Sequence, residues 1–132
     1  MPTRNVPLAD AGPRVEDVML RDPRTVGPET TVAAARETFE NPRVRLLLVA
    51  NGNAFLGAVR REGIDAEVAG DTPLGALAGA GDALVRPEDP VSRAVELLDA
   101  EQTDRLPVVT GDGALVGLVC FNRRYGHFCV DG

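Results

Sequence analysis

Residues 28–35 of the chain read PETTVAAA, and residues 87–94 read PEDPVSRA. The two segments that follow, RLLLV at 45–49 and FLGAV at 55–59, return as RLPVV at 105–109 and LVGLV at 115–119, after a slip of one residue before the first of them. A period of about 60 residues that is used twice indicates two copies of one supersecondary unit. The duplication is therefore the observation that determines the expected fold.

A unit of this size buries little apolar surface by itself. The two copies are therefore expected to pack face to face, through their sheets, about a pseudo-two-fold axis. Such packing creates two equivalent clefts, and clefts of this kind are where ligand sites are usually found.

Each copy is expected to contain a short strand, a helix, two strands and a final helix, which makes an α/β (α+β) fold. In the first copy, Thr30 is predicted to cap a helix over 31–40. An Asn51-Gly52 turn then joins strands at 45–50 and 54–60. In the second copy, a helix beginning at Pro90 is predicted to face inward with Val91, Ala94, Val95 and Leu98.

The two copies predict the domain boundaries. An irregular arm is expected over 1–14, repeat 1 over 15–70, repeat 2 over 71–122, and a tail over 123–132. Short helices are predicted over 62–69 and 72–78. The last residues, FNRRYGHFCVDG, show no helical periodicity, so the second repeat is predicted to lack its final helix and to end in an extended or irregular segment.

Composition excludes several functional classes. The net charge is -6, whereas nucleic-acid binders carry a basic surface. All 14 basic residues are arginine, a pattern typical of a GC-rich genome. No apolar run approaches the roughly 18 residues of a membrane span, and no signal peptide is evident. A cytoplasmic location and no membrane partner are therefore expected.

Cys120, His127 and Cys129 lie close together near the end of the chain. Imidazole and thiolates are zinc ligands, but a fourth ligand is not evident and the spacing matches no common zinc motif. The two cysteines of a cytosolic chain are expected to be reduced. No base is paired with either thiol, so neither a metal site nor an enzyme is predicted.

The ordered set of short motifs resembles a pair of CBS domains, the tandem called a Bateman module. The resemblance covers 15–122 and rests on Thr25-Val26, Pro28, Leu46-Leu47-Leu48-Val49 and Gly57-Ala58-Val59 in the first copy, and on Leu84-Val85, Pro87, Leu106-Pro107-Val108-Val109 and Gly117-Leu118-Val119 in the second.

The resemblance implies a regulatory module that binds AMP, ADP, ATP or S-adenosylmethionine in the clefts and modulates a partner protein, with no required cofactor. It also implies a homodimer, since closed two-fold assembly is the commonest oligomer. The ligand-binding residues that it suggests are Thr25, Val26, Arg60, Arg61, Leu84, Val85, Leu106, Pro107, Cys120 and Arg123.

The family pattern for ribose is Gly, two apolar residues, Ser or Thr, two variable residues, and Asp. Here Arg60 and Cys120 occupy the Ser/Thr positions, while Gly63 and Arg123 occupy the Asp positions. Both ribose carboxylates are missing. The extra arginines favour an anionic ligand. The alternative hypothesis is a ligand-independent dimerisation or interaction scaffold with degenerate nucleotide sites.

Overall fold

The computed structural model describes residues 13–78, 83–122 and 127–128. These residues form two compact units, and each unit is described by itself below. We call them the first-repeat unit (24–78 and 113–115) and the second-repeat unit (13–23, 83–112, 116–122 and 127–128). Across the described residues, no helix has the length and apolar character needed to cross a membrane.

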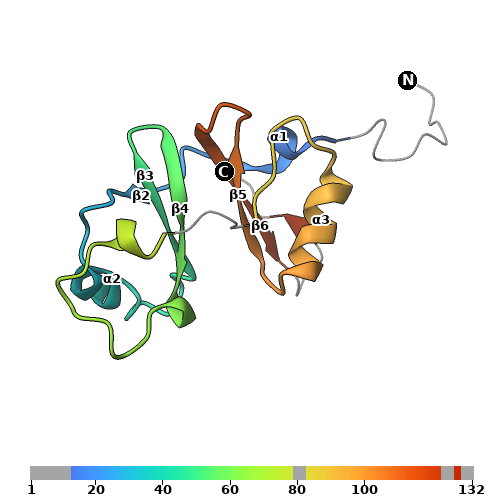
Figure 1. The fold of residues 1–132 in the computed structure, drawn as a ribbon. Helices are drawn as coiled ribbons and strands as arrows, with labels where there is room; N and C mark the ends of the chain where they lie inside the picture. The colour runs from blue at the N-terminus through green and yellow to red at the C-terminus, as the bar shows by residue number, and fades with distance from the viewer. Residues whose placement is uncertain (1–12, 79–82, 123–126, 129–132) are drawn as a thin grey trace, which may run out of the picture. The chain divides into compact units, whose positions relative to one another are not determined.

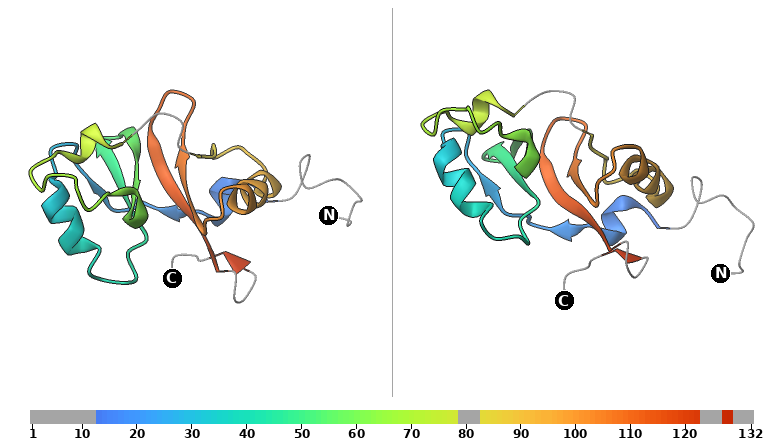
Figure 2. Two further views of the ribbon diagram at one scale, coloured as in Figure 1. Left: turned by 60° about the horizontal axis from the view of Figure 1, so that its bottom comes forward. Right: turned by 90° about the horizontal axis from the view of Figure 1, so that it is seen from below.

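The first-repeat unit is a three-stranded sheet with a helix on one face (Figures 1 and 2). The sheet order is β2 (Thr25–Val26), β3 (Leu46–Asn51) and β4 (Ala54–Arg60), with β2 parallel and β4 antiparallel to β3. Helix α2 (Val32–Thr38) covers one face of this sheet. The core between them consists of Val32, Ala35, Phe39, Val49, Val59 and Leu74.

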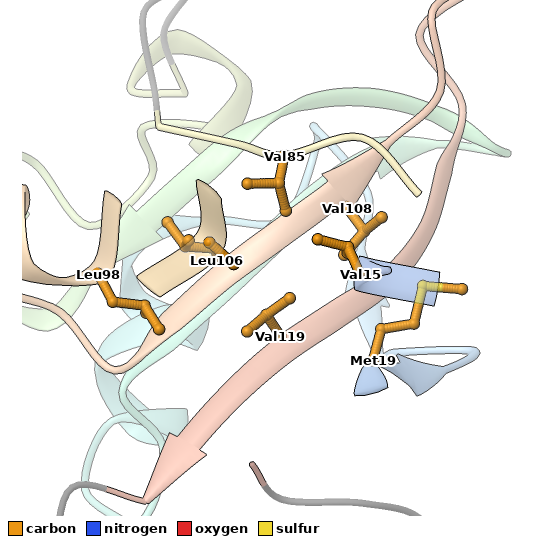
Figure 3. Close-up of a cluster of buried hydrophobic side chains, with 8 residues drawn as sticks. Val15, Met19, Val85, Leu98, Leu106, Val108 and Val119 are labelled. Atoms are coloured by element: carbon orange, nitrogen blue, oxygen red, sulfur yellow. The ribbon is translucent and has the colours of Figure 1, made fainter. Parts of the chain in front are cut away.

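The second-repeat unit repeats this plan with two additional strands. Its sheet order is β1 (Leu20–Arg21), β6 (Leu115–Asn122) and β5 (Arg105–Val109), and β7 (His127–Phe128) also pairs with β6. Helices α1 (Val15–Val18) and α3 (Val91–Ala100) pack on it. Figure 3 shows the core, which consists of Val15, Met19, Val85, Ala94, Leu98, Leu106, Val108 and Val119.

The opening segment of repeat 1 packs in the second-repeat unit. The Val15 N–H donates to the Asp89 carbonyl oxygen (2.8 Å), and the Glu16 N–H donates to the Pro87 carbonyl oxygen (3.0 Å). The Val15 side chain is fully buried in the core beside α3. Helix α1 is therefore anchored on the loop that precedes the helix of the other repeat.

The opening segment of repeat 2 makes the matching contacts in the first-repeat unit. The Leu74 N–H donates to the Thr30 carbonyl oxygen (2.7 Å), and the Gly75 N–H donates to the Pro28 carbonyl oxygen (2.9 Å). Leu74, in the 3₁₀ turn η2 (Leu74–Ala76), is also fully buried. The two repeats therefore exchange their opening turns, and the predicted boundary at residue 70 marks the duplication in sequence but not the limit of packing.

The structure corrects the position of the one-residue slip between the copies. The core residues Val32, Phe39 and Val49 match Val91, Leu98 and Val108 at a constant spacing of 59 residues. Only after the hairpin does the spacing become 60, where Val59 matches Val119. The extra residue therefore lies in the second hairpin turn and not before β5, because a slip before the strand would send its apolar side chains to the wrong face.

Several predicted elements differ in detail. Val95 is exposed and does not face inward. The predicted helix over 62–69 is a single 3₁₀ turn, η1 (Arg61–Gly63), and the helix over 72–78 is the turn η2. Glycine within each segment disfavours a longer helix.

The predicted strand at Leu84–Val85 is an isolated parallel bridge from Val85 to Val108. At residues 127–128 the predicted extended end forms β7, which pairs Phe128 with Phe121, and the rest of the predicted tail over 123–132 lies outside the described residues.

Helix α2 is capped by Thr31, and the prediction of Thr30 was wrong by one residue. The Thr31 Oγ1 accepts a hydrogen bond from the Ala34 N–H (3.2 Å). We expect Thr31→Ala to lower the free energy of unfolding by about 1 kcal/mol, because one helix N–H loses its acceptor. Urea denaturation measures this loss, and Thr30→Ala is the control. An equal loss in both variants would contradict the assignment.

Candidate functional site

The two faces of the first-repeat sheet differ in what they carry. Val49 and Val59 belong to the core under α2. Side chains alternate along a strand, so Leu48, Ala58 and Arg60 project from the opposite face, which we call the outer face. Thr25 is paired with Leu48 and therefore shares this face.

Two predicted ligand residues therefore lie on the outer face of the first-repeat unit, namely Thr25 and Arg60. Thr25 is exposed and Arg60 is half-buried at the end of β4, opposite Leu46. Val26, in contrast, packs against the core and lies on the other face. The outer face thus presents a hydroxyl at one edge strand and a guanidinium at the other.

Arg61 has a structural role that the sequence did not reveal. Its guanidinium donates to the carbonyl oxygens of Asn41 (3.1 Å) and Val44 (2.6 Å) and lies 5.5 Å from the centre of the Phe39 ring. These contacts tie the loop after α2 to the end of β4. Arg61 is therefore held by contacts within its own unit, whereas the Arg60 side chain lies on the outer face.

Gly63 occupies the position of the missing ribose carboxylate, at the end of η1. A Cβ atom built on Gly63 would meet no heavy atom within 4 Å, and its backbone is not in the left-handed region. The position therefore has room for a side chain. The carboxylate is missing because of the residue type and not because the fold excludes it.

In the second-repeat unit, the predicted site residues divide between two faces of the sheet. Val85 and Leu106 are fully buried in the core and face α3. The Val85 N–H donates to the Pro107 carbonyl oxygen (3.0 Å). By the alternation of side chains, Leu84, Pro107 and Cys120 project from the opposite face. Arg123 lies outside the described residues.

The glycine of the second motif allows a close approach of two strands. A Cβ atom on Gly117 would lie 2.4 Å from the Met19 Sδ and 2.9 Å from the Leu20 carbonyl oxygen. Gly117 pairs with Arg21, so β1 lies against β6 at this point. The glycine therefore serves the packing of the sheet, whatever the following residues bind.

Cys120 is buried and disulfide-bonded, which corrects the expectation of two reduced thiols. Its strand, β6, also pairs with β7 through Phe121–Phe128 and Asn122–His127. The short distance in sequence to Cys129 was the signal that could have indicated a disulfide.

Within the described part of the chain, no three His, Cys, Asp or Glu side chains form a group that could hold a metal ion. Cys129 lies outside that part.

The sequence model of the CBS domain matches residues 15–70 and 83–122. The chain belongs to the CBS domain family. The first segment has the bounds of the first predicted repeat, whereas the second begins at residue 83 and not at residue 71. Together they confirm a tandem CBS pair.

Among curated proteins, the CBS pair is similar to two enzymes named inosine-5'-monophosphate dehydrogenase. The protein from Thermoplasma acidophilum is 27% identical over 107 residues, which are 80% of this chain and 22% of that protein. The protein from Korarchaeum cryptofilum is 30% identical over 114 residues, which are 86% of this chain and 24% of that protein. The chain thus spans about a quarter of the length of these relatives.

Among solved structures, the CBS pair is similar to CBSX2 crystallised in complex with AMP. The TM-score is 0.71 at 27% identity, over 83% of this chain and 90% of that one. A protein from Vibrio cholerae described as a putative acetoin utilization protein, AcuB, gives a TM-score of 0.69 at 25% identity, over 81% of this chain and 83% of that one. These similarities confirm the mixed α/β fold.

Proposed function

We propose that this CBS pair is a regulatory module that binds an adenine nucleotide or a related anionic ligand and modulates a partner protein. Family membership and the AMP complex of the similar CBSX2 structure support the adenine part of this proposal. A CBS pair of the same fold, MJ0100, was crystallised with 5'-methylthioadenosine and S-adenosyl-L-methionine, so S-adenosylmethionine is included among the effectors to be tested. No required cofactor and no catalytic residue form part of the proposal.

The placement of Arg60 is the single observation that carries the proposal of an anionic ligand. Its side chain is half-buried on the outer face, three residues after Gly57, where the family has Ser or Thr. A guanidinium can bind a phosphate with two parallel hydrogen bonds, which a hydroxyl cannot do. In the proposed complex, Thr25 contributes its hydroxyl from β2 and Arg60 binds the phosphates. Leu84, Pro107 and Cys120, which belong to the second-repeat unit, stay predictions.

Arg60→Ala is expected to weaken ATP binding by about tenfold or more, because a hydrogen bond to a charged group contributes about 1.5–3 kcal/mol. Titration calorimetry with AMP, ATP and S-adenosylmethionine measures this change. Arg93→Ala removes the same charge from an exposed position on α3 and is the matched control. Equal affinities for ATP in the two variants would show that Arg60 does not bind the phosphates.

The missing carboxylates favour a second candidate function. Gly63 and Arg123 both stand where the family has Asp, and the Asp is the group that accepts the two ribose hydroxyls. A ligand-independent dimerisation or interaction scaffold would need neither ribose carboxylate. If none of the three ligands binds at millimolar concentration while the chain still associates, the scaffold is the correct description.

A homodimer is proposed under both functions. Sedimentation of the purified chain tests it, and a monomer at tens of micromolar would contradict it. The cytoplasmic location stays a prediction from the sequence.

A further inference from the structure

The turn between β3 and β4 begins with an exposed Asn-Gly pair, which plays no part in the proposed function (Figure 1). Asn51 is the last residue of β3, its side chain is exposed, and it pairs with Ala54 across the turn. Gly52 follows with φ 61°. A Cβ atom built on Gly52 would meet no heavy atom within 4 Å, so the space that a side chain would fill is open.

Within the residues that the structure describes, neither reacting group of this pair is held by a hydrogen bond. The Asn51 carboxamide has no partner among them, and the Gly52 N–H donates to none of their carbonyl oxygens. A bond between the Gly52 nitrogen and the Asn51 Cγ atom closes a succinimide ring. Glycine hinders this closure least, because it has no side chain and a wide choice of backbone angles.

We infer that Asn51 is a site of spontaneous deamidation, at which the Gly52 nitrogen displaces ammonia and water completes the change to a carboxylate. In the first step, the Gly52 nitrogen loses its proton to base and bonds to the Asn51 Cγ atom. The bond from Cγ to the amide nitrogen breaks, and ammonia leaves. In the second step, water opens the succinimide. The chain gains one water and loses one ammonia, so no oxidant or reductant takes part.

Water opens the ring at either carbonyl carbon, and the two products differ in their backbone. Cleavage of the bond between the Gly52 nitrogen and Cγ gives aspartate, which keeps the ordinary chain. Cleavage of the bond to the main-chain carbonyl carbon of residue 51 gives isoaspartate, in which the backbone runs through Cγ and gains one carbon atom. The first product adds only a charge, whereas the second also lengthens the chain at the start of the turn.

The lengthened product acts on the residues that follow the turn. The Phe55 N–H donates to the Gly113 carbonyl oxygen (2.9 Å), and the Leu115 N–H donates to the Asn53 carbonyl oxygen (2.8 Å). These two bonds hold residues 113–115 within the first-repeat unit. An extra backbone carbon at residue 51 displaces residues 53–55 along β3, because register determines which groups face each other. Isoaspartate at this position therefore opens both bonds.

Peptide mapping tests the site. The native full chain is incubated at mildly alkaline pH and digested with trypsin, which releases peptide 46–60 with both Asn51 and Asn53. We expect a mass gain of about 1 Da at Asn51. The gain at Asn53, the internal control, should be at least about tenfold slower, because the Ala54 side chain hinders ring closure there. Equal rates at the two positions, or no gain in the native chain while the isolated peptide 46–60 reacts, would overturn the inference.

Hydrogen exchange tests the effect on the hairpins. In the fraction that contains isoaspartate, the amides of Phe55 and Leu115 should exchange at least about tenfold faster than in the unmodified chain. The variant Asn51→Asp adds the charge without the extra backbone carbon. It is the matched control and should exchange like the unmodified chain. Equal exchange in the isoaspartate fraction and in Asn51→Asp would show that the longer backbone does not open these bonds. Neither measurement depends on a bound nucleotide.

Discussion

Replacing Gly63 with aspartate is expected to raise the affinity of the chain for AMP by about tenfold to a hundredfold. The new carboxylate would stand at the family's ribose position, where it can accept both hydroxyls, and a hydrogen bond to a charged group contributes about 1.5–3 kcal/mol. The gain requires that the side chain fit without strain. The open space around Gly63 and its ordinary backbone conformation meet that requirement.

The matched control for this gain is Gly111→Asp. Gly111 also has no heavy atom within 4 Å of a built Cβ, and it lies in the hairpin turn between β5 and β6. The control adds the same charge, so it separates a specific contact from a general electrostatic effect. Titration calorimetry with AMP measures both variants. Unchanged affinity in a folded Gly63→Asp chain would show that ribose does not bind at this position, and it would favour the scaffold function.

The second large effect concerns stability. Leu74→Ala is expected to lower the free energy of unfolding by about 3 kcal/mol, because it leaves a cavity in a fully enclosed site. Leu74 is completely buried beside Val32, Ala35 and Phe39. Urea denaturation measures the loss. Leu56→Ala makes the same chemical change at a side chain that is 40% exposed, and it should cost well under 1 kcal/mol.

Hydrogen exchange locates the effect of Leu74→Ala within the chain. Leu74 follows the predicted repeat boundary, yet it packs in the first-repeat unit. The amides of Val49 and Val59 should therefore lose protection, whereas those of Val108 and Val119 should keep it. The opposite pattern would assign η2 to the second-repeat unit and would contradict the exchange of opening turns.

The core positions could be predicted from the sequence because they follow the periodicities of helices and strands. Val91, Ala94 and Leu98 recur at helical spacing, and all three are buried in α3. Val95 was assigned to the same face and is exposed. Helical spacing alone left this position ambiguous, because the width of the buried stripe depends on what packs against it.

The candidate site was less accessible to sequence reasoning. The motif positions of Arg60 and Gly63 were identified from the resemblance, but the carbonyl contacts of Arg61 were not. Those contacts join η1 to a loop about 20 residues earlier in the chain. No local pattern encodes such a partner. For the same reason Val85 and Leu106 were grouped with the ligand residues, although the strand pairing turns both toward α3.

The sequence by itself determined the duplication, the family, the two hairpins and the loss of both ribose carboxylates, because each of these depends on residue type and spacing along the chain. Only the tertiary structure decided that the repeats exchange their opening turns, that the extra residue lies in the second hairpin turn, and that Cys120 is bonded. These features depend on which surfaces meet across long separations in sequence. Apolar side chains such as Val15 and Leu74 are compatible with either unit until backbone hydrogen bonds and burial select one.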